Sequence, residues 1–102
     1  MSDNMQELQR DSTRAREAQA LLDNTLLNEV FDYLRKSYVE AWQAARDNEK
    51  REENWHNVHA IDRIKEHLAT VVANGRMAQE QIEQLVKVEQ RRKLRDEMRA
   101  RG

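Results

Sequence analysis

The chain has 102 residues, of which 38% are hydrophobic and 36% charged, with no proline, no cysteine and only two glycines. The absence of cysteine excludes disulfides, thiolate nucleophiles and thiolate metal sites. The shortage of glycine and proline leaves few places for the turns that a sheet requires, so we expect an all-α protein.

The core of such a protein must be thin, because a typical globular domain has about 45–50% apolar and about 25% charged residues. Thin cores over long helices are often completed by oligomerisation, and we therefore expect a homo-oligomer. No run of about 18 apolar residues is present, so we expect no segment that spans a membrane. The absence of cysteine fits an intracellular protein, and we expect a location in the cytoplasm. We treat residues 1–102 as a single helical domain.

Residues 1–22 predict a polar N-terminal helix. Their helix propensity is good, but the large apolar residues are few and widely spaced, so this helix is expected to fray or to depend on a partner. Asp23, Asn24 and Thr25 then form a cluster of favoured N-cap residues, which predicts the start of a second helix.

A long antiparallel helical hairpin is predicted from two apolar stripes, one in residues 24–46 and one in residues 49–73. Each stripe alternates steps of three and four, as one face of a helix does. Between the stripes, Asp47 or Asn48 can cap the second arm. The predicted hairpin core consists of Leu27, Phe31, Leu34, Tyr38, Trp42, Trp55, Val58, Ile61, Ile64, Leu68 and Val71.

The two stripes also predict a register. If Trp42 faces Trp55, the numbers of facing residues add to 97, and most large apolar residues then meet an apolar partner. This arrangement places the two tryptophans together near the tip of the hairpin. They could form a binding surface, but aromatic residues at helical spacing more often pack in a core.

Asn74 and Gly75 predict the end of the second arm, because glycine commonly follows the last turn of a helix. A C-terminal basic helix is expected over residues 76–100. Residues 87–102 contain seven basic and three acidic residues, whereas residues 1–86 contain eleven basic and sixteen acidic ones. The candidate contacts for nucleic acid or a protein partner are Lys87, Arg91, Arg92, Lys93, Arg95 and Arg99.

Four of these basic residues recur every four positions, so one face of the last helix is cationic. Such a face could contact phosphates without sequence specificity. The alternative is a solvated helix end, where cations also suit the negative end of the helix dipole.

Catalytic chemistry is not indicated. Glu52, His56 and His59 could approach one metal ion on a single helix. The sequence lacks an HExxH pattern and matches known ligand spacings only loosely, so we favour the interpretation that these are polar residues flanking the apolar stripe. No nucleophile elbow, phosphate-binding glycine loop or dinucleotide fingerprint occurs. We expect no enzyme activity and no cofactor.

Several segments resemble short helical proteins encoded by phages and prophages, and among these the small terminase subunit class. The resemblance covers about two-thirds of the chain, from residue 17 to residue 85. The residues that carry it are 20–29 (ALLDNTLLNE), 38–42 (YVEAW), 51–52 (RE), Trp55 and 67–78 (HLATVVANGRMA).

The resemblance implies a bacteriophage protein in the host cytoplasm that takes part in viral genome packaging. Small terminases assemble into rings through helical hairpins and present DNA to the packaging motor, so the implied partners are DNA and the large terminase subunit. Residues 1–22 depart from the family pattern, because they are too short and polar for a DNA-binding helix-turn-helix. The alternative is a phage scaffold or structural component, or a regulatory protein that inhibits a host partner through its helical face.

Overall fold

The computed structural model describes the backbone of residues 2–101 and the side chains of residues 4–101. It contains three helices, α1 (Ser2–Leu22), α2 (Thr25–Ala44) and α3 (Asn48–Arg101), with 21, 20 and 54 residues. No strand occurs among the described residues, and the predicted all-α class is confirmed. Met1 and Gly102, which the predicted domain of residues 1–102 includes, lie outside the described residues.

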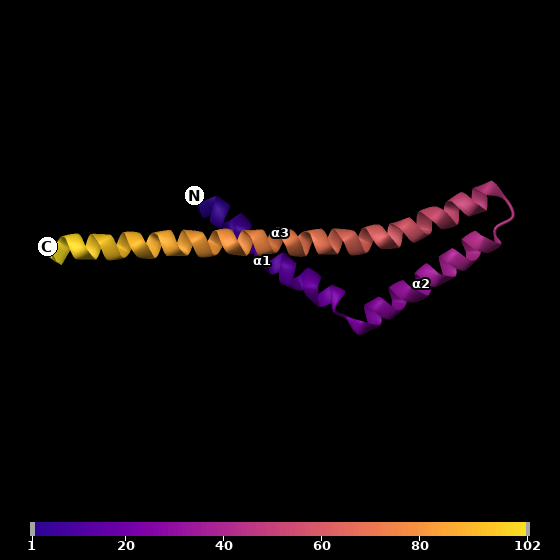
Figure 1. Ribbon diagram of the computed structural model, residues 1–102, viewed down its shortest axis with the longest axis horizontal. Helices are drawn as coiled ribbons and strands as arrows, with labels where there is room; N and C mark the ends of the chain where they lie inside the picture. The colour runs from indigo at the N-terminus through magenta and orange to yellow at the C-terminus, as the bar shows by residue number, and fades with distance from the viewer. Residues whose placement is uncertain (1, 102) are drawn as a thin grey trace.

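The three helices form an elongated molecule that measures 84 × 25 × 15 Å. α1 and α2 both run antiparallel to α3, with a bend between them, and α1 crosses α3 obliquely, so that its two ends lie on opposite sides of α3 in this view (Figure 1). The crossing lies near the middle of α3. α2 lies beside the first half of α3, and the short connection at residues 45–47 joins the two helices. The C-terminal end of α3 projects beyond α1 and meets no other helix (Figure 1).

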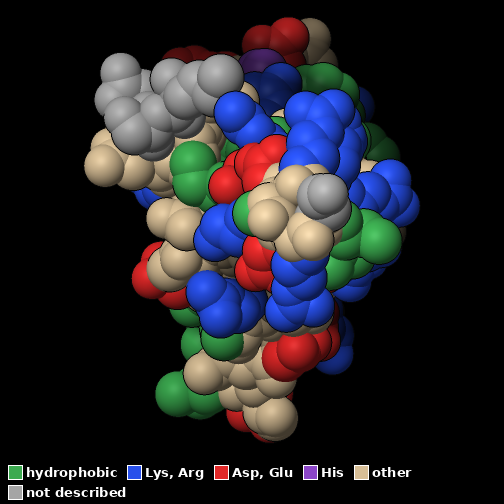
Figure 2. Space-filling view, turned by 90° about the vertical axis from the view of Figure 1, so that its left-hand side faces the viewer, with side chains coloured by type: hydrophobic (Ala, Val, Ile, Leu, Met, Phe, Trp, Pro, Cys, Tyr) green, Lys and Arg blue, Asp and Glu red, His purple; other side chains and the backbone are tan. Residues whose placement is uncertain are grey.

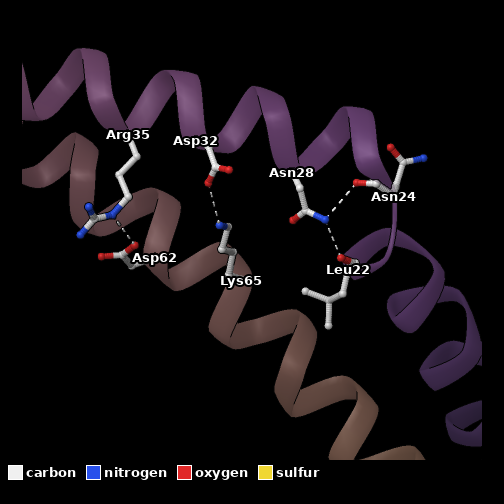
Figure 3. A network of polar contacts seen from close by, with 7 residues as sticks. All are labelled: Leu22, Asn24, Asn28, Asp32, Arg35, Asp62 and Lys65. Atoms are coloured by element: carbon white, nitrogen blue, oxygen red, sulfur yellow. Dashed lines mark hydrogen bonds and ion pairs between the residues drawn. The ribbon is translucent and has the colours of Figure 1, made fainter.

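The bend between α1 and α2 is stabilised by local side-chain hydrogen bonds. The Asn24 side chain accepts a hydrogen bond from the backbone N–H of Leu27 at 2.8 Å and so caps α2. The Asn28 side-chain amide donates to the carbonyl oxygens of Leu22 and Asn24, at 2.7 and 3.0 Å (Figure 3). At the next connection Asp47 accepts from the backbone N–H of Lys50 at 2.8 Å. The predicted caps are therefore present in both connections.

Gly75 does not end a helix, contrary to the sequence prediction. α3 continues through it without interruption, so the helices predicted at 49–73 and 76–100 are one helix. Gly75 is buried, and a Cβ atom added to it would collide with Cβ of Ala15 and would lie 2.7 Å from the Asp11 carbonyl oxygen. Glycine is needed here because the backbone of α1 crosses α3 at this point.

The predicted register of α2 against α3 is confirmed by two ion pairs. Arg35 Nε lies 3.3 Å from Asp62 Oδ1, and Lys65 Nζ lies 3.8 Å from Asp32 Oδ1 (Figure 3). The residue numbers add to 97 in both pairs. Lys65 also lies over the Phe31 ring, 5.6 Å from its centroid. The paired region covers only α2 and the first half of α3, and α3 then extends far past it.

The buried residues lie mainly where α1 crosses α3, rather than in the predicted hairpin. Val58 and Ile61 of the predicted core are buried, but α2 contributes no buried residue. Trp42, Trp55 and Ile64 are exposed to 39%, 44% and 48%. They were predicted as core residues because their spacing fits the stripes, yet a single helix facing α3 covers only a narrow strip of it. The buried hydrophobic residues are Leu8, Ala15, Ala18, Val58, Ile61, Val72 and Ala78.

Candidate interaction surfaces

The C-terminal part of α3, residues 83–101, is exposed at every position. Its first residues lie beside the start of α1, and the rest forms the projecting end. Residues 83–101 carry all six of the predicted basic contact residues. Figure 2 looks onto this end of the molecule and shows Lys and Arg side chains gathered around the tip of α3, with acidic side chains between them. The exposed apolar residues of this segment are Leu85, Val86, Val88, Leu94 and Met98.

Helical geometry divides the six basic residues into two groups. At about 100° per residue, steps of four drift by about 40°, so Lys87, Arg91, Arg95 and Arg99 lie along one side of α3. Arg92 points about 100° away from Arg91 and so lies outside this row. Lys93 points elsewhere and lines an open groove of about 610 Å³, together with Met5 of α1 and Val86. Four of the six predicted contacts therefore share one cationic face.

The connection end of the molecule holds an aromatic cluster different from the predicted one. The ring of Trp55 stacks on His59, with centroids 3.8 Å apart and an interplanar angle of 29°, and meets His56 edge to face at 5.1 Å. The Nδ1 atom of His59 lies 2.9 Å from the Trp55 carbonyl oxygen. Among residues 4–101 no three His, Asp or Glu side chains are grouped as a metal site would require.

A further apolar surface on α2 was not identified from the sequence. About half of the twenty residues of α2 are apolar, yet none is buried. Leu26 and Tyr33 are 69% and 71% exposed, and Val30 is 43% exposed. Together with Ser37 these residues follow one another in steps of four, three and four along one side of α2. We call the four residues the outer stripe. The spacing of these residues is visible in the sequence. The outer stripe lies beside the apolar stripe that faces α3, however, and the sequence pattern alone does not distinguish the two.

The geometry offers surfaces rather than an enclosed site. No polar or charged side chain is buried among the residues described, and the hollows along α1 and α3 are open grooves. Catalytic groups usually owe their altered acidity to burial beside other charges. The described residues therefore present two exposed surfaces, the outer stripe on α2 and the cationic face of α3.

The helices found between residues 2 and 101 include none that is long and apolar enough to cross a membrane. Comparison of the chain with protein-family models, with curated proteins and with solved structures finds no match in any of the three.

Proposed function

We propose that this protein is a non-enzymatic adaptor that works by assembling with copies of itself and by holding a polyanion against its basic helix. The observation that supports this most directly is the amount of exposed surface. The chain exposes 8658 Å², whereas a compact monomer of 12.2 kDa would expose about 6,100 Å². The difference is large compared with the roughly 800 Å² that each partner covers in a standard protein interface.

In its specific form the proposal is an adaptor for phage DNA packaging, like a small terminase subunit. The paired segment of α2 and α3 supplies a helical surface for packing subunits, and the projecting end of α3 supplies a cationic arm for DNA or the large terminase subunit. The resemblance of residues 17–85 to phage-encoded helical proteins supports the choice of partner. No helix-turn-helix is required, because contact with phosphates needs only positive charge.

Neutralising the cationic face should weaken DNA binding. Replacement of Arg91, Arg95 and Arg99 by Gln removes three charges from one side of α3, so affinity for duplex DNA should fall at least ten-fold at low salt. The logarithm of affinity should also depend less steeply on the logarithm of salt concentration, by about 0.9 for each phosphate that the variant no longer neutralises. Fluorescence anisotropy with a labelled duplex, measured at several salt concentrations, gives both quantities.

A matched control replaces three exposed basic residues far from the tail, Arg10, Lys50 and Arg63, by Gln. This variant has the same net charge as the first and should bind DNA much more tightly than it. Equal binding by the two variants would show that only overall charge matters and would contradict a role for the tail. If the wild-type protein does not bind DNA at low salt, the proposal that this protein binds DNA is contradicted.

A further inference from the structure

The outer stripe of α2 has no partner within the described chain, although it is built like a helix-packing surface. Leu26, Val30 and Tyr33 follow one another at the spacing by which one side of a helix packs against a neighbouring helix. The stripe turns away from the side of α2 that faces α3, because Phe31 and Asp32 meet Lys65 on that side. α2 therefore carries two apolar stripes, but only one of them packs against a neighbouring helix, α3.

We propose that the outer stripe binds the outer stripe of a second copy of this chain, with the two α2 helices antiparallel. The inference rests on the proposed function as an assembling adaptor and names the surface that does the assembling. An isologous contact of this kind uses the same residues on both copies. Centred between Val30 and Tyr33, it places Val30 of each copy level with Tyr33 of the other. Leu26 then lies level with Ser37.

The charges beside the outer stripe favour this antiparallel arrangement. Glu29 and Lys36 are seven residues apart and so lie on the same flank of the stripe. In the antiparallel pair Glu29 of one copy approaches Lys36 of the other, and the contact occurs twice. In a parallel pair aligned in register each of these residues would lie level with its own copy. Neither residue makes an ion pair elsewhere in the part of the chain that the structure describes.

The shape of the molecule supports a second copy as the occupant. A compact chain of about 100 residues has a radius of gyration of about 13 Å, whereas this one has 22.9 Å. On the side of α2 away from α3 no other helix approaches (Figure 1), and Leu26, Val30 and Tyr33 of the outer stripe are exposed. Two copies joined along α2 would place four helices side by side, α3 and α2 of each, and this would give α2 the second neighbour that its apolar residues require.

Sedimentation equilibrium over a range of concentrations tests the surface. The wild type should form a dimer, and Tyr33→Glu should weaken it at least ten-fold, because each dimer would bury two new charges. Leu94→Glu is the matched control, since Leu94 is 59% exposed on the projecting end of α3 and its replacement should change the dissociation constant less than two-fold. Circular dichroism should show unchanged helicity, because Tyr33 is already exposed in the single chain.

Charge reversal tests the antiparallel direction. Glu29→Lys and Lys36→Glu should each weaken the dimer, because each places like charges together, and the double variant should restore wild-type affinity to within a few-fold. A wild type that stays monomeric at every concentration, an equal effect of Tyr33→Glu and Leu94→Glu, or a double variant no tighter than the single ones would overturn the proposal.

The two proposals fail in distinguishable ways. A wild-type dimer that Tyr33→Glu disrupts, but that does not bind DNA, supports the α2 surface and contradicts the packaging function. An assembly that binds DNA and is unaffected by Tyr33→Glu contradicts the α2 surface alone. If the outer stripe binds a partner of another kind, the wild type alone should stay monomeric at every concentration, and this result would overturn the proposal.

Discussion

At the scale of single residues, Gly75 determines how α1 and α3 meet. Glycine inside a helix costs about 1 kcal/mol relative to alanine, so its presence in the middle of α3 requires a reason. The reason is the close approach of Ala15 and of the Asp11 carbonyl oxygen. Ala18 and Ala78 are also buried, and the hydroxyl of Ser12 donates to Gln79 Oε1 at 2.8 Å across the two helices.

Gly75→Ala should destabilise the protein although alanine is the better helix former. The added methyl group overpacks the crossing, and we expect the free energy of unfolding to fall by about 1–2 kcal/mol. The neighbouring Asn74 is exposed, so Asn74→Ala should raise it by a few tenths of a kcal/mol, from helix propensity alone. Urea unfolding followed by circular dichroism measures both, and stabilisation by both variants would refute the close crossing.

At the scale of elements, the features that could be predicted from the sequence are those that depend on residues close together in the chain. The caps at Asn24 and Asp47 depend on side chains bonded to backbone N–H groups three residues away, and such patterns are readable from sequence. The register of α2 against α3 was also predicted, because the apolar spacing of two adjacent helices joined by a short connection leaves few alternatives.

The parts that were not predicted depend on contacts between distant segments. The Asn74-Gly75 pair is as typical of a helix end as of a helix crossing, and only Ala15, sixty positions earlier, decides between them. The packing of α1 was missed because it uses alanines, which a search for large apolar residues disregards. Of the candidate sites, the basic face of α3 could be predicted from its four-residue repeat. The outer stripe of α2 could not, because it adjoins the apolar stripe that faces α3 and the two form one continuous apolar pattern in the sequence.

The face that α3 presents to α2 can be tested by two isoleucines three positions apart. Ile61 is 5% exposed and Ile64 is 48% exposed, so Ile61→Ala should lower the free energy of unfolding by about 2–4 kcal/mol. Ile64→Ala should cost less than about 1 kcal/mol, since much of its side chain already meets water. Chemical denaturation of the two variants provides the comparison, and a reversed order would show that α3 is rotated relative to α2.

At the scale of the whole molecule, the protein spreads 102 residues over a length of 84 Å. Single chains of this size bury only part of their apolar surface even when compact. Here the helices touch along narrow strips, and thirteen large hydrophobic residues among positions 4–101 remain exposed. We propose that assembly covers the apolar surface of α2, while the projecting end of α3 stays free for a charged partner.

The central claim, that the protein works as an assembly, is tested most directly by light scattering coupled to size-exclusion chromatography at low and high salt. We predict a mass of at least two chains of 12.2 kDa at both salt concentrations, because salt screens the flanking contacts of Glu29 with Lys36 but does not weaken the apolar part of the interface. A mass of 12.2 kDa at every protein concentration and at both salt concentrations would contradict this claim.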